Sequence, residues 1–162
     1  MASDFLLDIT GIKGESIDDK HPGTIELQSW SWGVSNMGSA GVGSGMGTGK
    51  ASFQDFSFNH MMDKASTALI QHCASGDHIP KAVLYGRKQG GKDEGQVDFL
   101  VVTLEDLIVS SVATGGSEGG GIPSESVSLN YAKVKIEYAA QKAKGGLEAY
   151  STAKWDLKTN KG

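Results

Sequence analysis

The hydrophobic positions of this chain alternate with polar ones, and the phase of the alternation reverses three times. Successive side chains of a β-strand point to opposite faces, so a period of two predicts strands with one buried face. Apolar residues move from odd to even positions after Leu27, after Phe53 and after Tyr131. The residues concerned are Ile25 and Leu27, then Trp30, Trp32 and Val34; Ala51 and Phe53, then Phe56 and Phe58; Val127, Leu129 and Tyr131, then Val134, Ile136 and Tyr138.

Such reversals have two ordinary causes. A β-bulge inserts an extra residue and re-aims the strand, or a strand is covered first on one face and then on the other. Both are typical of coiled, closed or two-sheet β-structure, whereas a flat sheet with one wet face would keep one phase. The pattern therefore predicts a mainly all-β chain.

Further strands are expected at residues 5–10, 78–88, 96–104, 107–113 and 125–138, with a short closing strand that carries Trp155 and Leu157. The segments 78–88 and 96–104 form a predicted hairpin around the turn GGKDEG. Glu105 and Asp106 lie between the strands expected at 96–104 and 107–113. Because adjacent strand residues face opposite ways, the two carboxylates predict a bulge or an edge there. We expect a single domain over residues 1–162 with a flexible tail after about 158.

One helix is predicted, over residues 63–75. Asp63 or Ser66 can cap its start, and Gly76 suits its end. One face at helical spacing consists of Ala65, Ala68, Leu69, His72 and Cys73. Cys73 is therefore expected to be a small buried core residue, and as the single cysteine it leaves no internal disulfide.

Charge and composition exclude several functions. A formal net charge of −4 argues against a nucleic-acid-binding protein, which normally carries a basic patch. The N-terminal stretch MASDFLLDITG has no basic region and is interrupted by Asp8, so it does not resemble a secretory signal. Apolar runs are far shorter than the ~20 residues that span a bilayer, so we expect a chain made in the cytoplasm without membrane insertion.

No pattern in the sequence assembles a catalytic, cofactor or metal site. A phosphate loop ending at Gly49 and Lys50 would require glycine at Ser44 and a hydroxyl at Ala51. The histidines lack the spacing of metal ligands, and neighbouring helical residues such as His72 and Cys73 point about 100° apart. The enzyme hypothesis therefore ranks last, with no residue to name.

A glycine tract, residues 38–49, separates the first two phase reversals. Six of its twelve residues are glycine and none is charged. Ordering glycine is costly in entropy, and long loops of this kind are usually functional or disordered. We expect this loop to reach out of the fold and to order against a partner surface.

Six segments resemble one known family over nearly the whole chain. They are GIKGES (11–16), WSWG (30–33), FQDFSF (53–58), HIPKAVLYGRKQGG (78–91), LEDLIVSSVATGGS (104–117) and SESVSLNYAKVKIEY (124–138). In this order they resemble the haemolysin-coregulated protein (Hcp) family, the tube protein of bacterial type VI secretion systems. WSWG and SSVATGGS are the more specific of these segments.

The resemblance implies a two-sheet β-barrel with one flanking helix. It further implies a structural and carrier protein that forms a hexameric ring with a wide lumen. Such rings stack into a tube inside a contractile sheath, beneath a spike protein, and some members carry small effector proteins. The protein would leave the bacterial cytoplasm through this machine without a signal peptide. The runner-up function is a monomeric β-barrel that binds a small ligand.

Two groups of residues are candidates for function. Trp30 and Trp32 belong in the barrel core, so Ser29 and Ser31 point outward from the same strand. The resemblance puts this strand on the inner wall of the ring, which makes Ser31 and Ser29 candidates for a lumen or cargo contact. An ordinary solvated position for Ser31 is an equally open alternative. The candidates for a ring-stacking loop are Gly41, Val42, Gly43, Ser44, Gly45 and Met46.

Overall fold

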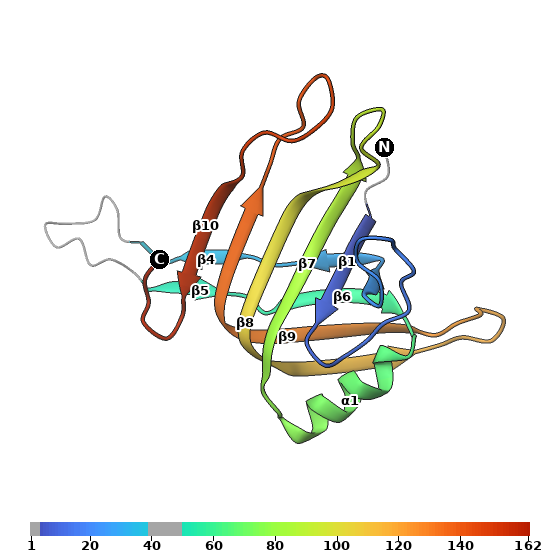
Figure 1. Ribbon diagram of the computed structural model, residues 1–162. Helices are drawn as coiled ribbons and strands as arrows, with labels where there is room; N and C mark the ends of the chain where they lie inside the picture. Colours follow the sequence, from blue (N-terminus) through green and yellow to red (C-terminus); the bar gives the residue numbers. More distant parts are fainter. Residues whose placement is uncertain (1–3, 39–49) are drawn as a thin grey trace, which may run out of the picture.

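The computed structural model describes residues 4–38 and 50–162, and most of them form β-structure (Figure 1). The elements are β1 (Asp4–Ile9), β2 (Ile25–Leu27), β3 (Ser29–Ser31), β4 (Val34–Asn36), β5 (Ala51–Phe53), β6 (Phe56–Met61), α1 (Ala65–Ser75), β7 (Ile79–Gln89), β8 (Gln96–Gly115), β9 (Ser124–Tyr138) and β10 (Ser151–Asp156). The predicted mainly-β fold with one helix is confirmed for these residues.

One antiparallel sheet wraps around almost into a barrel. Its strand order is β2-β1-β7-β8-β9-β6-β3, and β10 also pairs with β9. The two ends of this order, β2 and β3, are separated in the chain by Gln28 alone, whose N–H donates to the carbonyl of Asn59 at 2.8 Å. The barrel is therefore closed by one short segment that pairs first with β1 and then with β6.

β8 and β9 are long strands that belong to two layers of the barrel. The first section of β8 pairs with β7, and the last section of β9 pairs with β10; these sections form one layer together with β1 and β2. The remaining sections of β8 and β9 form the second layer with β6 and β3. Figure 1 shows the strands of the two layers running in nearly perpendicular directions.

In both long strands the buried and exposed faces exchange at the same place, which we call the corner. The buried residues change from even to odd between Leu104 and Leu107 in β8, and from odd to even between Tyr131 and Val134 in β9. The pairing register on the two sides of the corner is unchanged, so no extra residue is involved. The third phase reversal thus comes from a strand whose two halves cover the core with opposite faces.

Asp106 lies at this corner with a φ of 53°. Its carboxylate accepts hydrogen bonds from His78 at 2.8 Å and from Lys158 at 2.5 Å. These two bonds, the Lys158 bond first, hold the pKa of Asp106 below its usual range. The predicted break at Glu105 and Asp106 is therefore a backbone corner within one continuous strand, and the expectation of two separate strands, 96–104 and 107–113, was wrong.

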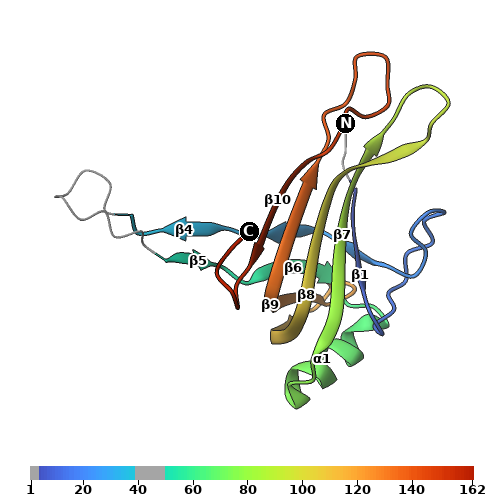
Figure 2. The ribbon, with the colours of Figure 1, turned by 60° about the vertical axis from the view of Figure 1, so that its left-hand side comes forward.

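The other two reversals coincide with changes of strand partner. Gln28 separates β2 from β3, which pair with different strands. Gln54 and Asp55 separate β5, which pairs with β4 in a two-stranded sheet, from β6. This β4–β5 pair projects away from the barrel as an arm (Figure 2), and it leaves Val34 half exposed.

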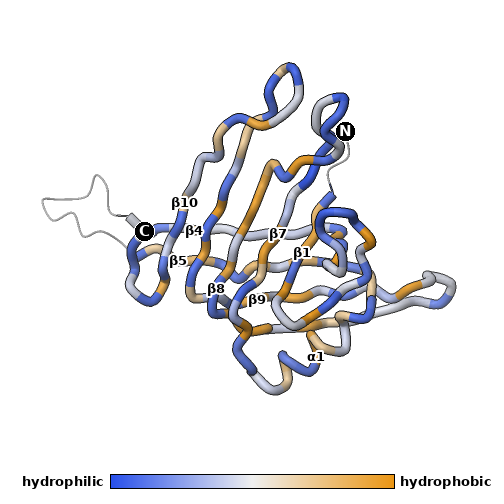
Figure 3. Tube along the Cα trace, viewed as in Figure 1, coloured by the Kyte–Doolittle hydropathy of each residue, from blue (hydrophilic) through white to orange (hydrophobic). Residues whose placement is uncertain are grey.

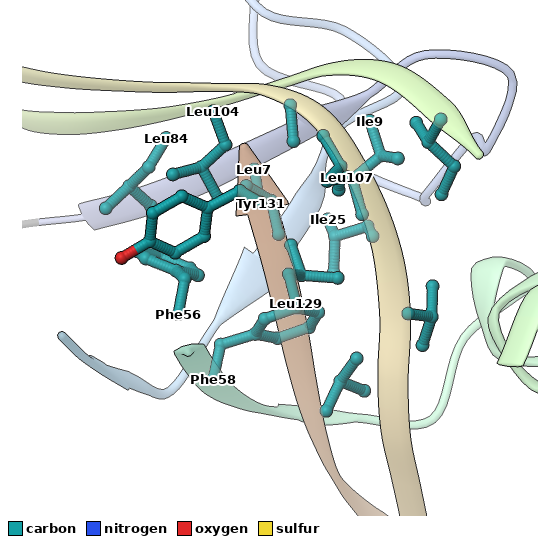
Figure 4. Close-up of a cluster of buried hydrophobic side chains, with 14 of the residues drawn as sticks. Leu7, Ile9, Ile25, Phe56, Phe58, Leu84, Leu104, Leu107, Leu129 and Tyr131 are labelled. Atoms are coloured by element: carbon teal, nitrogen blue, oxygen red, sulfur yellow. The ribbon is translucent and has the colours of Figure 1, made fainter. Parts of the chain in front are cut away.

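The barrel interior is a packed hydrophobic core (Figure 4). Hydrophobic and hydrophilic positions are interleaved along the strands that enclose it (Figure 3). Phe56 and Phe58 are the largest fully buried aromatic side chains, and Trp30 is stacked on Phe56 with ring centroids 5.8 Å apart. Trp30 and Trp32 are half-buried rather than fully enclosed, and both pack against the core as the alternation predicted.

Helix α1 covers the end of the barrel beside β8 (Figure 1). It begins two residues later than predicted, and the Asp63 carboxylate accepts a hydrogen bond from the N–H of Ala65 at 2.8 Å. Gly76 ends the helix with a φ of 73°, as expected. Cys73 packs against the core as expected but is half-buried, so it is less enclosed than the buried core residue that was predicted.

An imidazole and a carboxylate are enclosed together where the second layer meets α1. The side chains of His60 in β6 and Glu125 in β9 are both 0% exposed, and Nε2 of His60 lies 2.8 Å from Oε1 of Glu125. His60 Nδ1 and Glu125 Oε2 have no hydrogen-bond partner among the described residues. Asp63 Oδ1 is 3.9 Å from His60 Nδ1, within ion-pair distance but too far for a hydrogen bond. Each member of the pair therefore has the other as its side-chain hydrogen-bond partner, and an unpaired buried polar group is costly.

Replacement of one member of this pair should be more damaging than replacement of both. Glu125→Met leaves the His60 imidazole buried without its partner, and we expect it to lower the free energy of unfolding by about 3–5 kcal/mol. His60→Leu combined with Glu125→Met should recover most of that loss. Urea unfolding at one fixed protein concentration measures both, with exposed Ser124→Ala as the control. A double variant as unstable as the sum of the single variants would contradict this account.

Candidate functional site

The outer side of the second layer is an exposed sheet face built from small polar residues. It spans β3, β6, the first section of β9 and the last section of β8. We call it the serine face and define it by Ser29, Ser31, Ser57, Asn59, Ser111, Ala113, Ser124, Ser126, Ser128 and Asn130. Apolar Met61 and Ile108 lie at its margins, and none of the outward positions in these strand sections carries a charge.

The pairing registers align these residues in rows across the four strands. One row is Ser31, Ser57, Ser128 and Ser111, and the next is Ser29, Asn59, Ser126 and Ala113. Ser111 joins its row because the register of β8 shifts between Val109 and Ser111, which leaves Ser110 as an extra residue. Because of this β-bulge, the residues that follow it point to the opposite face from the one that uninterrupted alternation would give them.

Hydrogen bonds connect the rows from strand to strand. The amide of Asn59 donates to the hydroxyl of Ser29 at 2.9 Å and accepts a bond from the hydroxyl of Ser126. The hydroxyls of Ser57 and Ser128 are 3.0 Å apart. The side chains of this face are thus short and uncharged, and many of their hydrogen-bonding groups bond to one another.

The structure places Ser29 and Ser31 on this face, both exposed, with Trp30 between them turned toward the core. The outward direction predicted from the alternation is therefore correct. The other members were missed by sequence reasoning, although the alternation Ser-x-Ser-x-Ser at residues 124–128 was a signal.

Asp55 lies at one border of the serine face, directly before β6. Its carboxylate accepts a hydrogen bond from the bulge residue Ser110 at 2.7 Å and another from Asn130 at 2.9 Å. These two donors come from β8 and β9, so the carboxylate bridges three segments of the second layer.

The outer side of the first layer has the opposite chemistry. One row across it consists of Lys81, Glu105, Lys133 and Asp156, in which the charge alternates from strand to strand. Lys133 Nζ is 3.9 Å from a carboxylate oxygen of Asp156. The next row contains Thr103, Lys135 and Lys154. We call this the charged face.

The arm formed by β4 and β5 is attached to the barrel through Tyr131. The indole N–H of Trp32 donates to the Tyr131 hydroxyl, which in turn donates to the carbonyl of Gln54 at 2.8 Å. Trp32 precedes β4 and Gln54 follows β5, so both lie at the base of the arm, where the N–H of Gln54 donates to the carbonyl of Gly33 at 2.9 Å. The proposed stacking residues Gly41, Val42, Gly43, Ser44, Gly45 and Met46 lie outside the described residues.

Residues 4–38 and 50–162 contain no cluster of three histidine, cysteine, aspartate or glutamate side chains suited to hold a metal ion. No helix in these ranges is long and apolar enough to cross a membrane. The candidate site that the pairing registers define is a surface, made of one neutral and one charged sheet face on a single barrel.

Comparison with known proteins assigns this barrel to a family. Residues 6–138 match the family model described as type VI secretion system effector, Hcp. Protein hcp1 of Pseudomonas aeruginosa is 43% identical over 161 residues, which are 99% of this chain and 98% of that protein. The chain belongs to the Hcp family.

Solved structures agree with this assignment. A structure of a type six secretion system protein superposes with a TM-score of 0.89 at 31% identity, covering 99% of both chains. Hcp1 from Salmonella typhimurium gives a TM-score of 0.79 at 41% identity, again over 99% of both chains. The protein is thus a member of a family of secreted, structural type VI secretion proteins that is not known for enzymatic activity.

The contribution of Tyr131, which attaches the arm to the barrel, should be measurable at alkaline pH. Burial raises the pKa of Tyr131 to about 12, to which the Asp55 carboxylate contributes, while the bond from Trp32 acts in the opposite direction. A raised pKa in the folded state stabilises the fold below the ordinary value of 10.0, and this stabilisation is lost as pH rises from 10.0 toward about 12.

We therefore expect the wild-type free energy of unfolding to fall more steeply above pH 10.0 than that of Tyr131→Phe. At neutral pH the variant should be less stable by about 1–3 kcal/mol, because Trp32 Nε1 loses its acceptor. Urea unfolding across this pH range measures both effects. Tyr85 and Tyr150 titrate in both proteins, so parallel curves would show that Tyr131 does not contribute.

Proposed function

We propose that the protein is the subunit of the type VI inner tube, a hexameric ring whose lumen is lined by the serine face. In this proposal rings stack into a tube, the tube lies within a contractile sheath beneath a spike protein, and small effector proteins travel in the lumen. The chain is made in the bacterial cytoplasm and is secreted through this machine without a signal peptide. Membership of the Hcp family and the resemblance of the six segments support it.

The observation that carries the proposal is the neutrality of the serine face. Solvent-exposed sheet faces normally carry interspersed charged residues, which keep proteins soluble and separate. Here the charged residues gather on the other layer, and the serine face presents small hydroxyl and amide groups over four strands. A surface along which other proteins must pass should have short side chains, no charged groups and no large apolar groups. The serine face has those properties.

The arm supports self-assembly. An isolated pair of strands is marginally stable in water, and the arm leaves Met37 91% exposed and Val34 51% exposed. A neighbouring subunit that packs against the arm would remove this apolar surface from water, as happens in closed rings of identical subunits.

The runner-up, a monomeric barrel with a small ligand inside, has less support. The interior between the layers is filled by side chains from Leu7, Phe56, Leu84, Leu104 and Leu129, each at most 1% exposed. Barrels that hold a ligand keep interior space for it. No observation on the described residues favours nucleic acid or a cofactor as a partner.

Light scattering on the purified protein tests the ring directly. At micromolar concentration we expect a mass about six times the chain mass of 17.0 kDa. Val34→Asp combined with Met37→Asp places charge on the exposed arm, and it should shift the mass toward the monomer while the circular dichroism of the barrel is retained. A monomeric wild-type protein would exclude the ring.

Ser31→Gln tests the lumen. Ser31 lies in the all-serine row, so a longer side chain there narrows the proposed lumen without entering the core. We expect intact rings of normal thermal stability and a fall of about tenfold in co-purification of a co-expressed small effector of the same secretion system, equivalent to about 1.4 kcal/mol.

Thr152→Gln is the matched control, because it adds similar bulk to exposed β10 on the first layer. It should leave both ring and cargo unchanged. If Ser31→Gln abolishes the ring, Ser31 is a subunit contact; if cargo binding is unchanged in an intact ring, the cargo site lies elsewhere.

A further inference from the structure

The carboxylate of Asp55 lies at one border of the neutral serine face. Asp55 directly precedes β6, and its hydrogen bonds with Ser110 and Asn130 place its carboxylate beside the second-layer sections of β8 and β9. Asn130, which donates to it, is the serine-face residue that follows Ser128 along β9. The carboxylate therefore lies one row beyond the all-serine row, at the border of the face.

The charge of Asp55 is not neutralised by a neighbouring cation. Its two hydrogen bonds come from an uncharged hydroxyl and an uncharged amide, at 2.7 and 2.9 Å. Within the described part of the chain, no lysine, arginine or histidine forms an ion pair with it. An ionised carboxylate can accept about four hydrogen bonds, so acceptor capacity remains free for a further donor.

The charged face shows what a balanced arrangement looks like in the same molecule. Glu105 pairs across the strands with Lys81 on one side and Lys133 on the other, and Lys133 approaches Asp156. Such mutual neighbours weaken the field that each carboxylate projects into solvent. Among the described residues Asp55 forms no ion pair with a cation, so its field is not weakened in this way.

We propose that Asp55 is a specificity-determining residue for cargo, through which the serine face selects cationic protein surfaces. The inference rests on the proposed function, in which the serine face lines the lumen of a ring. Repetition in each subunit then makes a belt of carboxylates around the lumen, where charges of one sign raise the local concentration of opposite charge. Lysine and arginine side chains of a cargo donate to the free carboxylate lone pairs, and acidic cargo is disfavoured.

A purely structural role for Asp55 would be to hold the bulge at Ser110. Substitutions distinguish this structural role from the proposed selection of cationic cargo. Asp55→Asn removes the charge at nearly constant shape. Adding Ser57→Asp to it returns one carboxylate to the same face, about 7 Å along β6. Ser110→Ala removes one of the structural hydrogen bonds and leaves the charge.

The experiment measures binding of fluorescent oligolysine and oligoglutamate peptides of equal length to rings at low salt, with ring mass checked by light scattering on each sample. Relative to wild type, Asp55→Asn should weaken oligolysine binding about tenfold, consistent with the loss of several exposed ion pairs. Asp55→Asn combined with Ser57→Asp should restore it, and Ser110→Ala should retain it. Oligoglutamate should bind wild-type rings no better than Asp55→Asn rings.

Asp77→Asn is the matched control, since it removes one exposed carboxylate just after α1 and changes the net charge equally. An equal loss of oligolysine binding in Asp77→Asn would show attraction by net charge and would overturn the role of Asp55. Unchanged oligolysine binding in intact Asp55→Asn rings would overturn the role of Asp55 in cargo selection and leave the ring in place. Failure of the added Ser57→Asp to restore oligolysine binding would do the same. Absence of rings in the wild type would overturn the proposed function together with it.

Discussion

The fold depends on one constraint: β8 and β9 serve both layers of the barrel and must turn over at the same point. At the corner beside Asp106 the two strands keep their pairing while their buried faces exchange. Both layers can then direct apolar side chains into one core although their strands run in nearly perpendicular directions (Figure 1). The ion pairs of Asp106 with His78 and Lys158 join the corner to the start of β7 and to the segment after β10. The neutral and charged faces look in different directions because of this turn.

The alternation of side chains carried much of this information. Phase reversals indicated a barrel or two sheets, and the parity of Trp30 and Trp32 placed Ser29 and Ser31 outside. Such patterns report only which face of a segment is covered. They do not report the partner strand, and Ser57 and Ser128, whose hydroxyls meet, are separated by 71 positions in the sequence. The composition of the serine face was therefore beyond sequence reasoning, since pairing across a closed sheet depends on the whole barrel.

The remaining errors have similar causes. β8 was divided in two because Glu105 and Asp106 look like a break, whereas tertiary ion pairs let the strand continue through Asp106. Cys73 was expected inside because helical spacing gives a face but not its width, and only part of α1 faces the barrel. The enclosed pair of His60 and Glu125 gave no local signal, because each residue alone resembles an ordinary polar strand residue.

The two outer faces contribute little to holding the barrel together. Exposed ion pairs such as Lys133 with Asp156 contribute at most about 1 kcal/mol each, and neutral hydroxyl pairs contribute similar amounts. Stability comes instead from the core and from burial of aromatic rings on the inner sides of the same strands. The chemistry of either face can therefore vary with little effect on the fold, which suits surfaces that serve recognition.

The single-residue link at Gln28 makes the length of the chain there more critical than its composition. Its side chain is exposed, so many residue types fit, but its backbone sets where β3 starts relative to β6. One added or deleted codon at this point would shift β3 by one residue. Because strand side chains alternate with a period of two, the shift would turn the tryptophans outward and the serines inward. A frame-preserving insertion at Gln28 would thus replace the hydroxyls of β3 on the serine face by indoles, at a position where substitutions are tolerated.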